Sequence, residues 1–478
     1  MFPTLSDQLN MSQKKDPVSK VFTDPVHGQI ELHPLCVKII DTPEFQRMRF
    51  IRQLGPCLFL YHGASHSRFE HCIGVCHLAG KLVEAITARQ EDKVSDKKRL
   101  CVKIAGLCHD LGHGPFSHMF EKVVKKGPNK KWKHEEASQK LIDRIYKHLK
   151  TEFKDLGDLE AEDVEFIKEL IHPSEELYDK VKNGGDEQKK KDFFLYEIVA
   201  NETYKVDVDK WDYFARDSLY LGVKNSFDHD RLIASARACV DTDGVSHVTY
   251  RDKDVDNLYE MFHIRFTLHR KAYQHRLNKA VEMMIGDAME LADDIRVMGD
   301  DEKPKMIHEA VDDMGAYIKL NDDVLHRIAE SSSERARTLV ARIYTRDIYT
   351  YIGEKTIKVK MTEEAVIDEI IMKEKWEGKE KERDDMKQLL GVDIASYDYG
   401  NKDKNPVLNA YFYTKEDKQN AVHLDEKIFG RRMMVPMQFN ETVARVFCKS
   451  TETGHKDSLK EMTKRWSQPK DGLGTDGE

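Results

Sequence analysis

The sequence predicts a mainly α-helical protein that carries a smaller mixed α/β lobe toward its C-terminal end. Apolar residues recur every three to four positions from about residue 42 to about residue 350, the spacing of helices with one buried face. Beyond residue 350 the pattern changes to short alternating runs, which are typical of strands. With 478 residues, the chain is long enough for two or three lobes and a sizeable core.

The N-terminal part is expected to be a tail followed by an extended stretch. Residues 1–19 are polar and have no periodicity, so we expect a flexible tail there. Lys20–Glu31 is expected to be extended, and a helix should follow, with Thr42 as its N-cap and Pro43 at its first position. Residues 20–350 are expected to form one helical domain.

Two segments of this helical domain have distinct predictions. Cys239–Arg251 has Asp243-Gly244 between β-branched and aromatic residues, which predicts a β-hairpin. Val255–Asp294 contains no proline and keeps helical spacing throughout, which predicts one long helix. Such a helix suits a subunit interface and a core-spanning role equally well.

Residues 351–455 are expected to form the mixed α/β lobe, and residues 456–478 a C-terminal tail. The charged run Lys373–Lys387 predicts a solvated helix or loop. Short strands are predicted at Thr356–Lys360, Asp393–Tyr399, Asn409–Lys415 and Ala421–Leu424.

The composition argues against several classes of protein. The 77 basic and 85 acidic side chains give a net charge of −8, which disfavours a protein dedicated to coating nucleic acid. No run approaches the ~18 apolar residues of a membrane span, and the first ten residues lack the layout of a secretory signal. We therefore expect an intracellular protein. Its eight cysteines form no C-x-x-C pair, which predicts reduced, buried thiols rather than disulfides or a zinc ribbon.

Four residues could hold a divalent metal ion. They are His71, the adjacent pair His109-Asp110, and Asp209, each in a segment with helical spacing. Two imidazoles and two carboxylates would supply four ligands and leave positions for water and a phosphate oxygen, as a hydrolytic centre requires. Taken singly, each is as well explained as a core histidine or a helix cap, since the chain has 21 histidines.

Further polar residues accompany these four. His113 and His118 follow the His-Asp pair in a Gly-Pro turn, and His134 lies beyond, so several imidazoles could gather near a metal. After Asp209, the residues Lys210, Tyr213, Arg216 and Asp217 recur with helical spacing and could bind phosphate, sugar or base. A salt-bridged structural helix would use similar residues. The chain has no P-loop, no dinucleotide-type glycine fingerprint and no nucleophile elbow, so phosphates would be held by metal and side chains.

At these residues the chain resembles the HD-domain phosphohydrolases. It is still more similar to the sterile-alpha-motif and HD-domain deoxynucleoside triphosphate triphosphohydrolases, from Lys20 to about Lys449. The most specific segments are Asp24–Gly28, Gly63–His71, Ala105–Phe120 and Asp207–Asp217. The sterile-alpha-motif domain itself is expected to be missing, since 19 residues precede Lys20, and the family's regulatory C-terminal tail is expected to be short.

The resemblance implies hydrolysis of a deoxynucleoside triphosphate (dNTP) to a deoxynucleoside and inorganic triphosphate. It implies His71, His109, Asp110 and Asp209 as ligands of zinc, iron or manganese, with magnesium accompanying the nucleotide. It also implies His118 as the acid near the leaving 5′-oxygen, helped by His113 and His134, and Asp209 as a catalytic residue. The implied triphosphate contacts are Arg68, Lys210 and Arg265; the implied deoxyribose contacts are Gln53, Leu54, Tyr213, Asp217, Tyr273 and Gln274. An aromatic ring packed against C2′ would exclude ribonucleotides sterically.

Members of the family are activated by GTP or dGTP and then a dNTP, which join four subunits. The residues that match the activator sites are Lys20, Val21, Asp41, Gln46, Arg49, Leu60, Tyr61, Arg231, Arg251, Lys253, Asn257, Arg276, Leu277, Arg346 and Lys415. Asp41 alone is equally explained as a helix-start residue. Thr23 and Gln29 replace an Asn and a His of the family's second activator pocket, and Thr350 replaces a Lys near the tetramer contact.

Two alternatives stay open from the sequence. The metal site could serve a phosphodiesterase or nuclease, or the chain could be a nucleotide- or RNA-binding scaffold with a vestigial site. The basic segment Lys125–Lys133, which contains Trp132, could stack on single-stranded nucleic acid, although a solvated loop explains it as well. A nuclear location and an antiviral role by dNTP depletion follow from the resemblance alone; otherwise we expect the cytoplasm.

Overall fold

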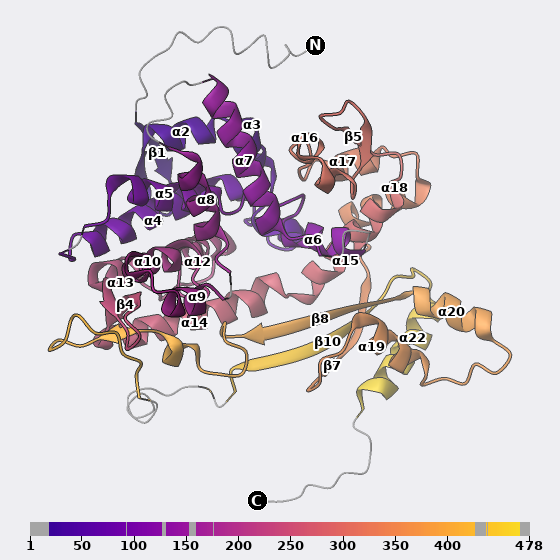
Figure 1. The fold of residues 1–478 in the computed structure, drawn as a ribbon. Helices are drawn as coiled ribbons and strands as arrows, with labels where there is room; N and C mark the ends of the chain where they lie inside the picture. Colours follow the sequence, from indigo (N-terminus) through magenta and orange to yellow (C-terminus); the bar gives the residue numbers. More distant parts are fainter. Residues whose placement is uncertain are drawn as a thin grey trace, which may run out of the picture.

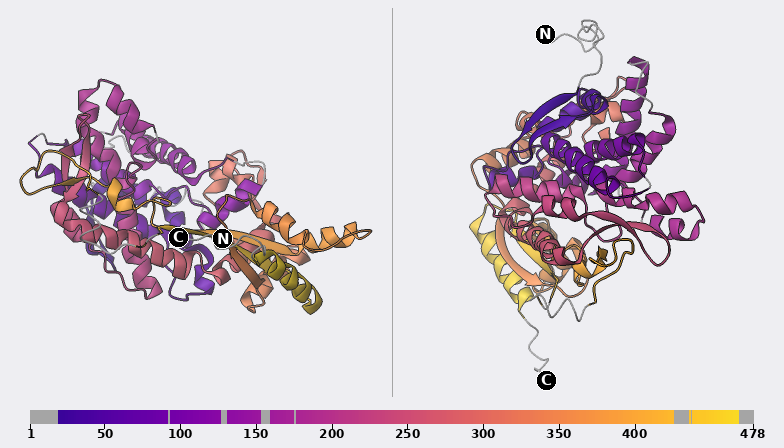
Figure 2. Two further views of the ribbon diagram at one scale, coloured as in Figure 1. Left: turned by 90° about the horizontal axis from the view of Figure 1, so that it is seen from below. Right: turned by 90° about the vertical axis from the view of Figure 1, so that its left-hand side faces the viewer.

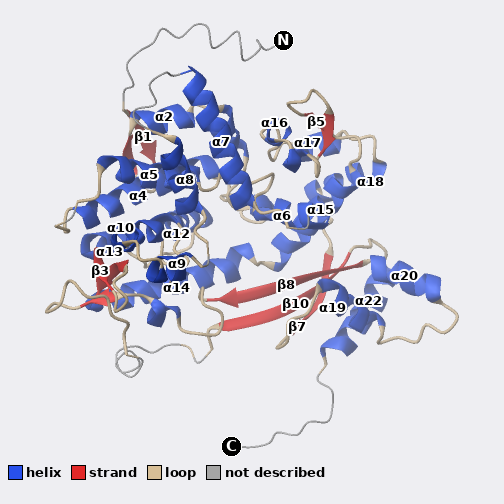
Figure 3. Ribbon diagram, in the orientation of Figure 1, coloured by secondary structure: helices blue, strands red, loops and turns tan. Residues whose placement is uncertain are grey.

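The computed structural model describes residues 19–91, 93–126, 131–152, 159–174, 176–425, 436 and 438–468. The predicted N-terminal tail, apart from residue 19, lies outside this range. Helices dominate the described part, and the strands form small sheets (Figure 3), so the predicted mainly α-helical class with a mixed C-terminal lobe is confirmed. None of the described helices combines the length and the apolar character that crossing a lipid bilayer requires.

The chain begins with a β-hairpin. Strands β1 (Lys20–Asp24) and β2 (Gly28–Leu32) pair antiparallel, so the extended stretch predicted there is present and folds back on itself. Helix α2 (Pro34–Ile40) follows. Helix α3 (Pro43–Gln46) begins at Pro43 with Thr42 at the N-cap position, as predicted, but the Thr42 hydroxyl donates to the carbonyl oxygen of Ile39 (2.7 Å) and makes no cap bond to α3.

The helices that carry the polar motifs pack around the main core (Figure 1). Helix α4 starts with a capping box in which the N-cap Ser67 and Glu70 bond each other's backbone. Helix α12 starts at the N-cap Asp207 and ends at Gly222, whose φ of 65° suits glycine. The bounds are α4 (Arg68–Thr87), α5 (Asp96–Cys108), α6 (His118–Lys126), α7 (His134–Glu152), α8 (Ala161–Ile171), α9 (Leu177–Asn183), α10 (Glu187–Asp192), α11 (Tyr196–Val199), α12 (Val208–Leu221) and α13 (His229–Ser235).

The predicted hairpin is confirmed: β3 (Arg237–Val240) and β4 (Ser246–Arg251) pair antiparallel.

The prediction of one long helix over Val255–Asp294 is wrong. Helix α14 (Val255–Leu268) passes into a π-turn, η5 (His269–Tyr273), and α15 (Arg276–Leu291) then starts anew. The Gln274 amide donates to the carbonyl oxygen of His269 (2.8 Å), and Nδ1 of His275 accepts from the Leu277 amide (3.3 Å). These local bonds replace the α-helical ladder.

The C-terminal sheet has the strand order β7-β10-β8, all antiparallel. Its strands are β7 (Thr350–Thr356), β8 (Leu390–Asp398) and β10 (Asn440–Cys448), and α19 (Glu363–Ile371), α20 (Glu380–Gln388) and α22 (Thr453–Ser467) accompany them. In Figure 1, α14 and α15 run between the N-terminal helices and this sheet. Figure 2 shows α20 and α22 projecting to one side of the molecule.

The predictions for this lobe are partly right. The strand at Asp393–Tyr399 lies in β8, and α20 is a largely exposed helix within the charged run. The prediction of a strand at Thr356–Lys360 is wrong, because the strand in this region, β7, lies before that segment and ends at Thr356. Of the strand predicted at Asn409–Lys415, only Phe412–Tyr413 is a strand, β9. The strand predicted at Ala421–Leu424 is reduced to a bridge between Val422 and Phe412.

The predicted tail at 456–478 is wrong as far as residue 467, which belongs to α22. This helix buries Leu459, Met462 and Trp466 in a second, smaller core together with the β7-β10-β8 sheet. Residues 469–478 lie outside the described range.

Strand β9 pairs in parallel with β4, so the residues around it belong to the main core. The segment 292–349 contains β5 (Arg296–Met298), β6 (Pro304–Met306), α16 (Met314–Tyr317), α17 (Val324–Ala329) and α18 (Glu334–Tyr344).

Candidate metal centre and active-site cavity

The four residues predicted as metal ligands meet at one point. Nε2 of His71, on α4, lies 3.1 Å from Oδ1 of Asp209 and 3.5 Å from Oδ2 of Asp110. Nε2 of His109, at the end of α5, lies 3.3 Å from the same Asp209 oxygen and 3.5 Å from Oδ1 of Asp110. Three helices therefore bring together residues that are up to 138 positions apart.

This donor set fits a divalent cation. Nδ1 of His109 lies 2.8 Å from the carbonyl oxygen of Gly106 and donates to it, which leaves Nε2 with a lone pair. That Nε2 is buried and has no hydrogen-bond partner among the described residues. An orphaned buried nitrogen beside two carboxylates can serve as a ligand of a metal ion, and the mixed N/O set suits zinc, iron or manganese.

The electrostatics of the cluster also favour a cation. Burial works against protonation of His71 and His109, yet the surrounding carboxylates outweigh it and raise the pKa of both. Burial works against ionisation of Asp110 and Asp209 too, but Arg68 and two imidazoles lower the pKa of Asp110, and the imidazoles of His109 and His71 lower the pKa of Asp209. The carboxylates are thus ionised and attract positive charge.

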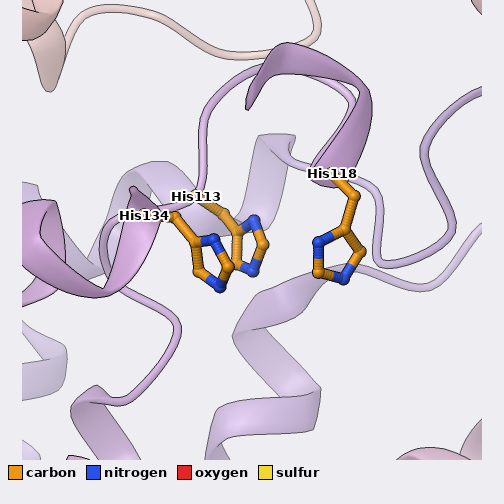
Figure 4. Close-up of side chains that lie close together, drawn as sticks. All are labelled: His113, His118 and His134. Atoms are coloured by element: carbon orange, nitrogen blue, oxygen red, sulfur yellow. The ribbon is translucent and has the colours of Figure 1, made fainter. Parts of the chain in front are cut away.

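A second group of imidazoles lies beside the metal cluster. The rings of His113 and His134 stack with centroids 3.9 Å apart, and His118 stands edge-on to His113 at 4.8 Å (Figure 4). Nε2 of His113 lies 3.3 Å from Oδ1 of Asp110, which joins the two groups. Burial, Arg68 and His134 lower the pKa of His118 to about 3, although part of its ring is open to the cavity, so the free protein holds it neutral.

A cavity of about 200 Å³ opens above both groups. The predicted site residues that line it are Gln53, Arg68, His109, Asp110, His113, His118, His134, Asp209, Lys210 and Tyr213. Arg68 donates to Asp110 and, at 2.8 Å, to the Ser117 hydroxyl. Nζ of Lys210 lies 2.7 Å from Oδ2 of Asp207. The cavity is smaller than the ~300 Å³ or more of typical small-molecule pockets, so a complete nucleotide requires its walls to move.

Some predicted substrate contacts do not line this cavity. Nη1 of Arg265 donates to the carbonyl oxygen (2.6 Å) and Oδ1 (2.8 Å) of Asp398, at the end of β8. The backbone carbonyl of Gln274 accepts a bond from Arg445 of β10. The C-terminal sheet therefore holds both residues in place.

The residues predicted for the sugar form a separate polar and apolar group. Asp217 is buried; Oδ1 accepts from His66 (2.6 Å) and Oδ2 from the Tyr273 hydroxyl. Leu54 and Tyr273 pack against the same small apolar cluster. Oε1 of Gln53 is buried without a hydrogen-bond partner among the described residues, so it is free to bind a ligand.

The residues that match the activator sites lie on several surfaces. Nζ of Lys20 is 3.4 Å from Asp41, Gln46 bonds Arg49 (2.8 Å), and Val21 is exposed, which makes one surface around the N-terminal hairpin. Arg231 pairs with Asp254 (2.7 Å), Arg251 lies next to Tyr413, and Asn257 bonds the Asp228 backbone. Leu60, Tyr61, Lys253, Arg276, Leu277, Arg346 and Lys415 are exposed or half-buried. Thr23 and Gln29 face each other across the hairpin and bond at 3.2 Å.

Three site residues were missed by the sequence analysis. Oε2 of Glu121 lies 2.8 Å from Nδ1 of His134, and Asp212 lies 2.7 Å from Nδ1 of His71. Both follow a predicted site residue by three positions on a helix, a spacing that could have indicated them. His66, which holds Asp217, lies before α4 in the segment Gly63–His71, so no helical spacing linked it to a predicted site residue.

The possible nucleic-acid patch is not supported by the position of its aromatic residue. Trp132 is 9% exposed and packs edge-on against Phe120, so it offers no free face for a base. Residues 127–130 lie outside the described range.

All eight cysteines are buried and free, as predicted.

Comparisons with known proteins agree with this geometry. A family model of the HD domain matches residues 68–217, which include all four metal-site residues. Deoxynucleoside triphosphate triphosphohydrolase SAMHD1 of Xenopus laevis is 40% identical over 493 residues, covering 97% of this chain and 77% of that protein. The Homo sapiens protein of the same name is 41% identical over 478 residues (95% and 75%), and the Dictyostelium discoideum SAMHD1 homolog is 35% identical over 442 (91% and 78%). The chain belongs to the SAMHD1 family of HD-domain deoxynucleoside triphosphate triphosphohydrolases.

Proposed function

We propose that this chain is a metal-dependent dNTP triphosphohydrolase, which converts a dNTP and water to a deoxynucleoside and inorganic triphosphate. The observation that carries the proposal is the convergence of His71, His109, Asp110 and Asp209 beneath a cavity lined by cations and imidazoles. The family supports the same reaction, because the relatives named above are dNTP triphosphohydrolases.

The two histidines and two aspartates would hold zinc, iron or manganese, with magnesium accompanying the nucleotide. A cation bound there supplies Lewis-acid activation of the phosphoryl group and of water. Arg68 and Lys210 line the cavity and bind the triphosphate; both are paired with carboxylates in the free protein, and the phosphates replace those partners.

His118 serves as the acid. Water attacks the α-phosphorus, the bond from phosphorus to the 5′-oxygen breaks, and His118 delivers a proton to that oxygen. Because its pKa is low in the free protein, His118 gains this proton only when the negative triphosphate lies beside it. His134 is oriented by Glu121 and stacks on His113, which keeps the imidazole group in place.

The sugar end of the site selects deoxynucleotides. Asp217 and Gln53 bind the 3′-hydroxyl, while Tyr273 packs against C2′ and leaves no room for a ribose hydroxyl. Leu54, Tyr213 and Gln274 complete this end, and Arg265 joins the triphosphate once it leaves Asp398.

Activation by GTP or dGTP and a dNTP would act through the hairpin surface and the surfaces around Arg231 and Arg276. These surfaces are separate within one chain and rich in cations, which supports sites that are completed between subunits of a tetramer. A nuclear location and an antiviral role through lower dNTP pools belong to the same proposal.

The test is product analysis combined with sedimentation. The full chain with dATP, GTP and Mg²⁺ should release deoxyadenosine and triphosphate, and Asp209→Asn should not. The appearance of dAMP and pyrophosphate would refute the reaction. GTP together with dATP should shift the sedimenting species to a tetramer, and an unchanged monomer would refute the activation model.

A further inference from the structure

A fully buried carboxylate stands behind the metal cluster. Asp212, on α12, is 0% exposed, and its Oδ2 accepts from Nδ1 of His71 (2.7 Å). Its Oδ1 accepts from Nε2 of His27 (2.7 Å), and Arg216 binds both oxygens (2.9 and 3.0 Å). The charge of Asp212 is thus balanced by one guanidinium, while both imidazoles donate to it.

The same network continues into the N-terminal hairpin. Nη1 of Arg216 donates to Oδ2 of Asp24 (2.9 Å), and Oδ1 of Asp24 accepts from the amides of Val26 (2.8 Å) and His27 (2.9 Å). These bonds shape the turn between β1 and β2 and aim the His27 ring at Asp212. The turn and the metal ligand His71 therefore share one carboxylate.

Helix α4 leaves space for this carboxylate at Gly74. A Cβ at Gly74 would overlap Oδ1 of Asp212 and lie 2.6 Å from Nη2 of Arg216. Glycine inside a helix is unfavourable relative to alanine. Its presence here is explained by the close approach of Asp212 to the backbone one turn after His71.

We propose that Asp212 is a positioning residue of the metal centre, and that the turn Asp24–Gly28 is a structural part of that centre through His27. By accepting the Nδ1 proton, Asp212 fixes the tautomer of His71 and leaves Nε2 as the lone pair that faces Asp110 and Asp209. Arg216 and His27 hold the carboxylate itself in place. The inference rests on the proposed metal site.

The test measures metal binding directly, in the full chain. Asp212→Asn keeps the size of the side chain, but its amide group cannot accept from all of the donors that face it. We expect Asp212→Asn to weaken Zn²⁺ and Co²⁺ binding by about 10- to 100-fold and to change the visible ligand-field spectrum of bound Co²⁺. A surface control, Asp230→Asn, should bind like the unaltered chain. Wild-type affinity and spectrum in Asp212→Asn would overturn the proposal.

A second pair of variants covers the case in which Asp212→Asn does not fold. His27→Ala removes one donor to Asp212, from a side chain that is 3% exposed, whereas His27→Gln can still donate. His27→Ala should bind Co²⁺ several-fold more weakly, and His27→Gln should restore the binding. Equal, wild-type binding by both variants would overturn the role of the turn. If Asp209→Asn and His109→Gln bind metal as the unaltered chain does, the metal centre itself is rejected, which is a separate outcome.

Discussion

Asp398 holds Arg265 away from the cavity, and we predict that removing its charge will improve substrate binding. Nη1 of Arg265 donates to both the carbonyl oxygen and Oδ1 of Asp398, and the two side chains are only 20% and 24% exposed. Asp398→Asn keeps an oxygen that can accept from the Gly400 amide, which is 2.7 Å from Oδ1, so the loop should persist. The variant removes only the negative charge that competes with the triphosphate.

The expected size follows from this partial exposure. A partly exposed ion pair contributes about 1 kcal/mol, and that energy is lost when Arg265 turns to the substrate. Without the Asp398 charge, the triphosphate no longer competes with an ion pair for Arg265. A gain of about 1 kcal/mol should lower KM about fivefold, since about 1.4 kcal/mol corresponds to a tenfold change in affinity. The effect should shrink at high salt. The kcat should stay nearly unchanged because Asp398 touches none of the reacting groups.

The assay is the initial rate of deoxyadenosine release against dATP concentration at saturating GTP, at low and high salt. Asp385→Asn, which changes an exposed carboxylate on α20 in the same lobe, is the matched control. An unchanged KM would show that Arg265 does not bind the triphosphate. A raised KM would show that Asp398 orients Arg265 for binding, and either result refutes the reasoning.

Three further variants test other contacts. Arg445→Met removes the bond to the Gln274 carbonyl, so the turn beside the sugar site should loosen and the preference for dNTP over rNTP should fall about tenfold, measured from kcat/KM. Glu121→Gln leaves His134 with only the more distant carboxylate of Glu135 (3.4 Å) and should lower kcat about 10- to 100-fold with little change in KM. His247→Gln breaks a buried pairing with two carboxylates and should lower the free energy of unfolding by about 3 kcal/mol at pH 6, measured with urea.

The pH dependence of the last variant has a definite sign. Burial lowers the pKa of His247, but Glu197 and Asp241 outweigh it and raise the pKa above 6.5. The charged imidazole therefore stabilises the fold fully below pH 6.5, and this contribution is lost as the pH rises through the folded-state pKa. The difference between the two proteins should be larger at pH 6 than at pH 9. The reverse order would contradict a charged His247.

Conservative variants serve as controls for the other two. Arg445→Lys keeps a donor near Gln274 and should retain more selectivity than Arg445→Met, and an equal loss in both would point to general damage. Glu121→Asp keeps a carboxylate and should recover part of kcat. A large rise in KM in Glu121→Gln would instead assign Glu121 to substrate binding.

Local signals in the sequence predicted the elements that local bonds determine. Pro43 starts a helix because its fixed φ suits the first turn, and Asp243-Gly244 forms the hairpin turn because glycine tolerates the φ of 79° found at Gly244. The break between α14 and α15 escaped prediction because Val255–Asp294 contains no proline. It depends instead on the π-turn bond and on Arg445, which is 171 residues from Gln274.

In the site, too, residues with a local sequence signal could be predicted, and residues brought in by distant contacts could not. The His109-Asp110 pair and Asp209 could be proposed from residue type, and helical spacing could have added Glu121 and Asp212. The partner of Asp217 could not be found in this way, because His66 meets it through contact of α12 with the residues before α4, 151 positions away in sequence. Nor could the sequence indicate that Arg265 is held by Asp398, since that bond needs the C-terminal sheet to lie beneath α14.

The C-terminal sheet contacts three segments of the proposed site, which bears on where the site can move when a substrate binds. Lys122 lies 3.6 Å from Asp393 of β8, on the helix that begins with His118; Arg265 bonds Asp398; and Gln274 bonds Arg445 of β10. The proposed acid, the proposed triphosphate contact and the proposed sugar turn are therefore all held by one layer, the C-terminal sheet. A nucleotide that draws Arg265 into the cavity must break a bond to that layer. We expect the movement to be concentrated at the Arg265 side chain on α14 and at the loop after Asp398, because Lys122 and Arg445 still tie the other two segments to the sheet.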